Sequence, residues 1–482
     1  MIINLIKKNI TGIFIVFYLS VALVNDGFMG TDEYWNAMVK YLPAQTSKIT
    51  QLVAEDDVKS PLQVMPMFLG SQLALKIGIT HPYEQYHFTI VFLTLISILI
   101  YLFCFHLFRK YKNWLYEDDD KIFIGLMTFY FASSFALTRP MFEALGAPWL
   151  LLSCALFLKY QNTKSNISLI LSTLAVSMGF ILRQQTGIGA LTIPILLLYS
   201  KDFKGLWIAS ITGLVAFVIS GIPDVFLRGK FHQSLIAVTT YNMEHGHEYG
   251  NSSVFYYPIM LFIMGFIPFY FSKKITASFI KNNLVKQKFS LIFVILFVAL
   301  HSYFPQKFER FLISIIPLIL VLMTPFVGFL LRNFKTYKIR LTFLFLINFS
   351  VLFAASFQPS QGNIINLSLF IDKHPGINNV LNFEKTLEWI PEKFITNNHN
   401  YHIIDINQNQ IGTLDPKNCS QVIVINEFLY EKDKYLFKDY KIKDQFNVNF
   451  IESIAYKLNR KNNIRRSSLI VLGCPDYTNS IK

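Results

Sequence analysis

The chain has 482 residues, of which 53% are hydrophobic and 47 are phenylalanine. This composition excludes an ordinary water-soluble protein and is typical of a protein that crosses a membrane many times. The formal charge of +14 comes mostly from short loops between apolar runs. The sequence lacks the basic patches interleaved with aromatic residues that indicate nucleic-acid binding. We therefore expect membrane lipids as partners and no nucleic acid.

Eleven apolar runs predict membrane spans. The first, residues 10–24, follows Lys7 and Lys8 and has no small-residue cleavage site after it, so we interpret it as a retained anchor rather than a signal peptide. The other ten are residues 88–108, 122–137, 142–158, 167–182, 188–199, 206–222, 254–271, 289–304, 311–331 and 341–357. A twelfth apolar segment, residues 61–79, either crosses the membrane, lies in its interface or re-enters it.

The basic residues of the short loops predict the orientation of the chain. With the N-terminus in the cytoplasm, the cytoplasmic side receives the Lys/Arg-rich loops 109–112, 159–164, 201–204, 273–288 and 332–340. The opposite side receives loops 25–87 and 223–253, segment 305–310 and the turns that hold Arg139 and Arg183. We predict that the active site lies on this non-cytoplasmic face, toward a periplasm or the lumen of the endoplasmic reticulum.

The first outer loop carries the most informative motif, Thr31-Asp32-Glu33 followed by Tyr34-Trp35. Two carboxylates at a membrane boundary must stay hydrated or paired, and a carboxylate there can act as general base on a hydroxyl. Aromatic rings favour the headgroup zone and also stack on sugars. The alternative interpretation is a capped helix N-terminus with acidic residues in its first turn.

The predicted spans carry essentially no acidic or basic residues at mid-depth. Ion-coupled carriers usually need such groups near the membrane centre, so the sequence favours chemistry at the outer interface over transport. No metal site is predicted, because His245 and His247 form a His-x-His pair without a further ligand pattern.

Residues 361–482 differ from the membrane domain 1–360 in being mostly polar, with short apolar runs that predict strands. Helices are predicted over residues 384–390 and 451–458, which makes this segment a small C-terminal α/β domain outside the cytoplasm. It lacks a glycine-rich phosphate loop. An oxidising compartment could join Cys419 to Cys474, but the sequence leaves that pairing open.

Four stretches resemble, in the same order, the motifs of glycosyltransferase family 22, which belongs to the GT-C type. They are GTDEYWNAM, TRPMFEALGAPWLLLSCALF, IPDVFLRGKFHQSLIAVTTYN with EYGNSSVFYYP, and HSYFPQKFERFLISIIPLI. The resemblance implies an α-helical polytopic membrane fold of GT-C type. It also implies an inverting transfer of mannose from a polyprenyl- or dolichyl-phosphate donor to a lipid-linked glycan or glycolipid, with no other cofactor and no metal.

The resemblance also assigns roles to residues of this chain. Asp32 would take the proton from the acceptor hydroxyl, with Glu33 and Asp224 as the further catalytic candidates. The candidates for binding the donor phosphate are Lys307, Arg310, Arg183 and Arg139. The candidates for binding the sugar or the acceptor are Tyr34, Trp35, Glu143, Glu309 and Tyr249.

Alternatives remain for the residues and for the function. Lys307 and Arg310 could be interface anchors, and Arg183 could only satisfy carbonyl groups at a helix end. The chain reads QKFERF at residues 306–311 where the family has HKEERF, which leaves the sugar and the acceptor open. Another GT-C relative, of the protein O-mannosyl or aminoarabinose transferase type, is therefore an alternative, as are a flippase for a lipid-linked saccharide and a non-catalytic scaffold.

Overall fold

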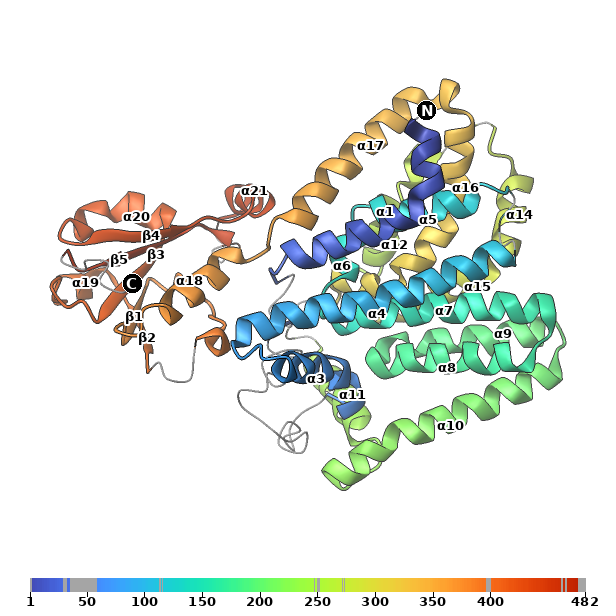
Figure 1. Cartoon of the computed structure of the whole chain (residues 1–482), viewed down its shortest axis with the longest axis horizontal. Coiled ribbons are helices and arrows are strands. Elements are labelled where there is room, and N and C mark those ends of the chain that lie inside the picture. Colours follow the sequence, from blue (N-terminus) through green and yellow to red (C-terminus); the bar gives the residue numbers. More distant parts are fainter. Residues whose placement is uncertain are drawn as a thin grey trace.

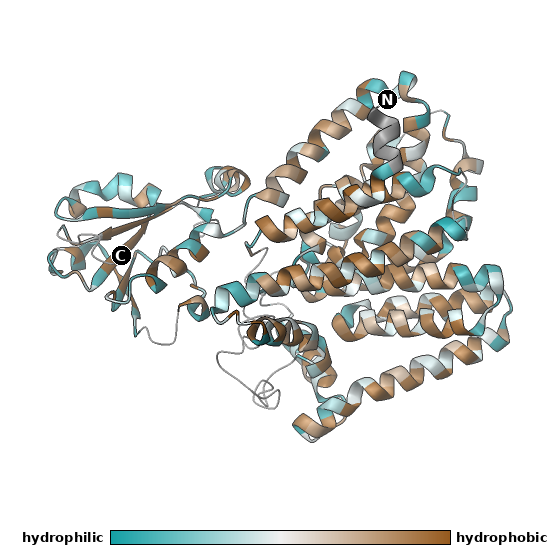
Figure 2. Ribbon diagram, in the orientation of Figure 1, coloured by the Kyte–Doolittle hydropathy of each residue, from teal (hydrophilic) through white to brown (hydrophobic). Residues whose placement is uncertain are grey.

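A computed structural model describes residues 2–28 (2–8 as backbone only), 33–34, 59–111, 114, 116–246, 248, 252–270, 272, 274–395, 400–460, 463 and 466–475. Most helices run side by side in one body, and a small sheet lies beyond one end of it (Figure 1). Apolar residues dominate the helices of this body, whereas polar residues gather at helix ends and over the sheet-containing tail (Figure 2). The chain is an integral membrane protein with an α/β tail.

Five helical runs within the described residues are long and apolar enough to cross a membrane. They are α4 (Pro82–Lys110), α7 (Phe142–Thr163), α10 (Phe203–Arg228), the joined helices η3 (Glu309–Ile315) and α16 (Ile316–Arg332), and the run of α17 (Phe334–Phe357) with α18 (Gly362–Asp372). A sixth is the pair α14 (Ala277–Lys286) and α15 (Lys288–Tyr303), which bends by 89°. Shorter apolar helices are α8 (Asn166–Leu182) and α1 (Ile2–Val24).

The other predicted spans are helical but broken. They hold α5 (Asp119–Phe129) with α6 (Ser134–Leu137), η2 (Gln184–Leu191) with α9 (Thr192–Tyr199), and α12 (Tyr256–Met264) with α13 (Ile267–Tyr270). Extended backbone at Tyr130 ends α5, and a positive φ of 51° at Phe266 separates α12 from α13. The segment 61–79 forms α3 (Pro61–Lys76), whose first residue is a proline suited to the start of a helix. The described part of the body also contains α11 (Gln233–His245).

Loops predicted to be cytoplasmic lie together at one end of the body. Arg332 Nη1 is 2.7 Å from Asp119 Oδ1, and Lys164 Nζ is 2.9 Å from Asp202 Oδ2. Hydrogen bonds from the Tyr160 hydroxyl and the Lys164 ammonium lower the pKa of Asp202 to about 2. These pairs join loops that are distant in sequence, as expected if the loops share one face of a membrane.

The tail contains one five-stranded sheet in the order β2-β1-β3-β5-β4. The strands are β1 (Asn379–Phe383), β2 (His402–Ile406), β3 (Gln421–Asn426), β4 (Lys441–Phe446) and β5 (Leu469–Gly473). β1 runs parallel to β2 and β3, and β5 runs antiparallel to β3 and β4. Every residue of β3 and β5 is buried, because apolar clusters cover both faces of the sheet. The short helices of the tail are η4 (Glu392–Phe394), α19 (Gln408–Ile411), α20 (Glu427–Asp433), η5 (Lys434–Phe437) and α21 (Phe450–Leu458).

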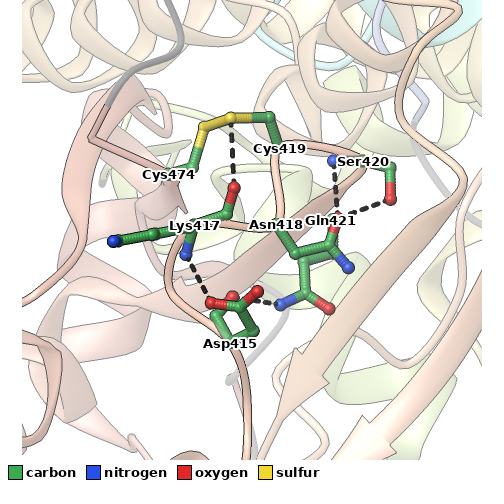
Figure 3. Close-up of a disulfide and its surroundings, with 7 residues drawn as sticks. All are labelled: Asp415, Lys417, Asn418, Cys419, Ser420, Gln421 and Cys474. Atoms are coloured by element: carbon green, nitrogen blue, oxygen red, sulfur yellow. Dashed lines mark hydrogen bonds between the residues drawn. A yellow bond between two sulfur atoms is a disulfide. The ribbon is translucent and has the colours of Figure 1, made fainter.

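Two features of the tail were uncertain or wrong in the sequence analysis. Cys419 and Cys474 form a disulfide across 55 positions, which fastens the turn before β3 to the end of β5 (Figure 3). The helix predicted over residues 384–390 is absent from this described segment. Glu384 and Lys385 have positive φ values of 48° and 53° there, and such left-handed backbone cannot continue a right-handed helix.

The tail packs against the beginning of the first outer loop. We name its described residues 25–28 and 33–34 the first outer segment. The Phe28 amide donates to the Ser360 carbonyl at 2.9 Å, and the Lys393 amide donates to the Tyr34 hydroxyl oxygen at 2.7 Å. The rings of Phe28 and Tyr34 form one apolar cluster with Phe394. The tail thus holds the chain next to the Asp32 position.

Candidate active site

Most of the charged side chains predicted for the site lie where helices of the body end, on the side nearer the tail. Glu143 is in the first turn of α7, Arg183 follows α8, Asp224 is near the end of α10, and Arg310 is the second residue of η3. Asp32, Trp35 and Tyr249 lie outside the described residues. The described candidates form three groups of contacts.

The first group centres on a buried ion pair. Arg183 Nη2 lies 2.9 Å from Glu143 Oε1, and the two side chains are 14% and 7% exposed. Glu143 sits at the start of α7, where the helix dipole favours a negative charge. The Arg183 guanidinium lies 5.0 Å from the centre of the Phe311 ring. This group therefore joins α7, the end of α8 and η3 at a single point.

A second guanidinium reaches the same ring. Arg310 lies 5.6 Å from the centre of Phe311 and 4.9 Å from the centre of Phe308. Aromatic faces attract cations and orient a guanidinium without using up its hydrogen-bond donors. Two guanidinium groups thus lie near one aromatic ring, with Glu143 paired to Arg183 and Glu309 next to Arg310 in the chain. The planar, forked donors of a guanidinium group suit the binding of a phosphate or carboxylate.

Neighbouring side chains hold the segment that carries Arg310. The Lys307 ammonium donates to the carbonyl oxygens of Ser252 at 3.0 Å and Phe304 at 2.5 Å, and burial lowers the pKa of Lys307. Glu309 accepts a hydrogen bond of 2.5 Å from the Tyr256 hydroxyl. Lys307 therefore ties the loop before α12 to the end of α15, a positioning role that its sequence pattern did not reveal.

The second group surrounds Arg139, which is 1% exposed. Its guanidinium donates to the carbonyl oxygens of Gly27, at 2.6 Å, and of Asn25. The Tyr86 hydroxyl donates to the same Gly27 carbonyl and lies within electrostatic range of both Arg139 and Glu33. Arg139 thus fixes the first outer segment onto the helical body, and Glu33 of that segment is buried.

The third group involves Asp224, which is 1% exposed. Its Oδ2 accepts hydrogen bonds from the Ser234 hydroxyl at 2.5 Å and the Ser234 amide at 3.0 Å, at the start of α11. Its Oδ1 lies 3.8 Å from Arg228 Nη1, and Arg228 donates to the Lys59 carbonyl. Asp224 therefore joins α10 to α11 and to the backbone just before α3.

Tyr34, predicted to contact a sugar, is fully buried in this structure. Its ring packs against Phe28, Trp389 and Phe394. The ring therefore has no face open for a sugar to stack on, because the tail covers it, and we leave Tyr34 out of the proposed site.

Two side chains near the ion pair were missed by sequence reasoning. His301 is buried, its Nδ1 lies 2.7 Å from the Phe297 carbonyl oxygen, and its ring is 6.1 Å from that of Tyr257. The Tyr257 hydroxyl donates to the Phe308 carbonyl at 3.3 Å. Both belong to the quoted motifs, in HSYF and VFYYP, so their place in those motifs was the available signal.

An apolar cavity of about 360 Å³ lies beside the Arg183 end of α8. It is lined by residues of α8, η2, α9 and α10, including Phe180, Ile181 and Gly213. The hydroxyl groups of Ser177 and Ser220 on its wall donate to carbonyls of their own helices, so they leave the cavity surface apolar. Such a volume is in the range of small-ligand pockets.

Comparisons with known proteins were made by sequence and by structure. No protein-family model matches the chain, and no curated protein matches it by sequence. Two crystal structures of ArnT from Cupriavidus metallidurans match it at 12% sequence identity. The form bound to undecaprenyl phosphate has a TM-score of 0.56 and the apo form one of 0.57. The first match covers 96% of this chain and 98% of that chain, and the second covers 98% of both.

The chain has the fold of ArnT. ArnT is a GT-C polytopic membrane protein with an extramembrane domain, so the predicted fold class is confirmed. The narrower resemblance to glycosyltransferase family 22 stays a prediction. An oligosaccharyltransferase from Archaeoglobus fulgidus matches at 13% identity over 90% of this chain and 72% of that chain, with a TM-score of 0.43 that is too low to support an argument.

Proposed function

We propose that the chain is an integral-membrane glycosyltransferase that takes a sugar from a polyprenyl-phosphate donor. The main support for this proposal is that the guanidinium groups of Arg183 and Arg310 both lie close to the Phe311 ring, at one end of the helical body. A departing lipid phosphate needs fixed positive charge, and guanidinium groups bind phosphate in a bidentate manner. Support comes from the shared fold with a protein crystallised with undecaprenyl phosphate.

The apolar cavity between α8 and α10 suits the lipid part of such a donor. Phe180 and Ile181 line it, and Arg183 lies two residues after Ile181 in the chain. A polyprenyl chain is uniformly apolar and would bury its surface against these walls, gaining roughly 25 cal/mol per Å² removed from water. Its phosphate would then lie toward the two arginines, and Lys307 is the third candidate to contact it.

The proposed reaction is a single displacement with inversion. The acceptor hydroxyl attacks the anomeric carbon, the bond from that carbon to the phosphate oxygen breaks, and the lipid phosphate leaves with the electron pair. The hydroxyl proton passes to a carboxylate, for which Asp32 is our first candidate and Glu33 the second. We propose a lipid-linked glycan or glycolipid as acceptor, on the non-cytoplasmic face.

Two donor sugars have specific support. The sequence resemblance favours mannose. The shared fold with ArnT, an aminoarabinose transferase, makes aminoarabinose the second candidate.

The test uses the purified full chain in lipid nanodiscs, with polyprenyl-phosphate mannose, polyprenyl-phosphate aminoarabinose and a panel of acceptor lipids. We expect transfer by the wild type and a rate loss of about a hundredfold or more in Asp32→Asn, because the substitution removes the base but keeps its shape. Arg310→Gln should mainly raise KM for the donor. Glu117→Gln and Arg340→Gln, in loops predicted to lie on the opposite face, are the matched controls and should keep wild-type rates.

Each outcome discriminates between the functions considered. Transfer that survives Asp32→Asn would move the base to Glu33. Transfer of aminoarabinose alone would replace mannose by the second candidate. An absence of transfer with all donors, together with exchange of the lipid-linked saccharide between leaflets, would refute the proposal in favour of a flippase.

A further inference from the structure

Helix α21 of the tail exposes an apolar face that the tail itself does not cover. Phe450 and Leu458 are 65% and 82% exposed, and Ile451 and Ile454 are also exposed. At 100° of rotation per residue, these four side chains lie within an arc of about 100°. Contiguous apolar surface of this kind on a water-soluble domain usually marks an interaction site.

The opposite face of α21 is fastened to the chain just after α17. Glu452 is buried, and its carboxylate oxygens accept the Gln361 amide at 3.0 and 3.1 Å. The Asn449 side chain accepts the Glu452 amide and donates to the Pro359 carbonyl at 3.2 Å. The Phe450 amide donates to the Gln358 side chain at 3.0 Å. The orientation of α21 is therefore fixed, with its apolar arc turned away from these partners.

This attachment places α21 at the height where a membrane span ends. α17 is long and apolar enough to cross a membrane and carries exposed apolar side chains such as Phe353. It stops at Phe357, directly before the residues that hold α21. Figure 1 shows α21 beside that end of α17. Lys457 and Arg460, at the C-terminal end of α21, are both exposed and suit the negative charge of lipid headgroups.

We infer that α21 lies flat in the membrane interface, with Phe450, Ile451, Ile454 and Leu458 among the lipid chains. The partner is the bilayer surface next to α17. An interfacial helix of this kind would fix the height and tilt of the tail above the membrane, and hence the height of the first outer segment that the tail holds. The inference does not depend on the proposed enzymatic function.

The test is a depth measurement on the full chain in vesicles of phosphatidylethanolamine and phosphatidylglycerol. A nitroxide label is placed on Ile454→Cys and, separately, on Leu458→Cys, without reduction of the native disulfide. The other two native cysteines, Cys104 and Cys154, are buried and should stay unlabelled. We expect collisions with oxygen to exceed those with an aqueous nickel chelate at both positions, corresponding to a depth of about 5–10 Å.

The matched control is Lys432→Cys on α20, an exposed position of the same tail, where the nickel chelate should prevail. Equal accessibility of the labels at positions 454, 458 and 432 to the nickel chelate would overturn the inference. Dipolar broadening at position 454 that disappears when the protein is diluted with lipid would also overturn it, because the partner would then be a second copy of the chain.

Discussion

The buried pair of Glu143 and Arg183 gives the sharpest test of the site. We consider Glu143→Leu, Arg183→Leu and the double variant. The two charged groups are 2.9 Å apart with side chains 7% and 14% exposed, so solvent screens them little. Removing one partner leaves a buried charge without its counterpart, at a cost of about 3–5 kcal/mol in unfolding free energy.

The double variant separates the free energy of the Glu143–Arg183 ion pair from the loss of stability that each substitution causes by itself. Replacing both members of a buried ion pair by apolar side chains is often neutral, so the double variant should be far more stable than the sum of the single losses predicts. The coupling free energy between the two positions should be about 3 kcal/mol. The double variant should nevertheless lose sugar transfer, because Arg183 is then missing from the proposed phosphate site.

The measurement is equilibrium unfolding of all four proteins in mixed micelles of dodecyl maltoside and increasing dodecyl sulfate, followed by circular dichroism. A coupling free energy below about 0.5 kcal/mol, as expected of independent positions, would refute the buried pair. A double variant that folds and still transfers sugar at the wild-type rate would refute the role of Arg183 in binding the donor, while leaving its structural role intact.

Three further outcomes follow from particular contacts. A Cβ atom at Gly189 would overlap the buried Phe293 ring of α15, so Gly189→Ala should lower the free energy of unfolding by about 1–3 kcal/mol. Gly213→Ala should be tolerated, because the nearest atom to its added Cβ is 3.8 Å away. Thermal unfolding of the two variants tests the difference. Reducing the Cys419–Cys474 disulfide should cost about 4 kcal/mol in the chain-entropy model, since it closes a loop of 55 positions, and should speed proteolysis of the tail. The pKa of Asp202 falls from 3.8 to about 2 on folding, so the ionised carboxylate stabilises the fold above pH 4 and this stabilisation disappears as the pH falls toward 2. The difference in melting temperature between the wild type and Asp202→Asn should therefore shrink between pH 4 and pH 2. A constant difference would contradict the lowered pKa.

The membrane architecture could be predicted because hydrophobicity over long runs is a local property of the sequence. Every predicted span contains helix, and loops expected on one face do contact one another, as Lys164 and Asp202 do. The breaks at Tyr130 and Phe266 could not be predicted, because apolar residues lie on both sides of each and conceal the change of backbone direction.

The sequence offers candidate residues for the site, but it does not indicate the partners of those residues. The motifs indicated Glu143 and Arg183 separately, yet nothing in the sequence pairs residues on two different helices. Lys307 has the side chain of a phosphate ligand, and only the fold shows that it also donates to two carbonyl groups. The burial of Tyr34 could not be predicted either, because the Phe394 ring that packs against it belongs to the tail.

The contact between Tyr34 and Lys393 joins residues that are 359 positions apart. Lys393 follows the last predicted membrane span, so the ribosome must synthesise every predicted span before Tyr34 can contact Lys393. The charged motif around Asp32 is synthesised early, but the surroundings that fix its neighbour Tyr34 are synthesised last. Under the proposed function, a nascent chain would therefore be inactive until its tail has folded.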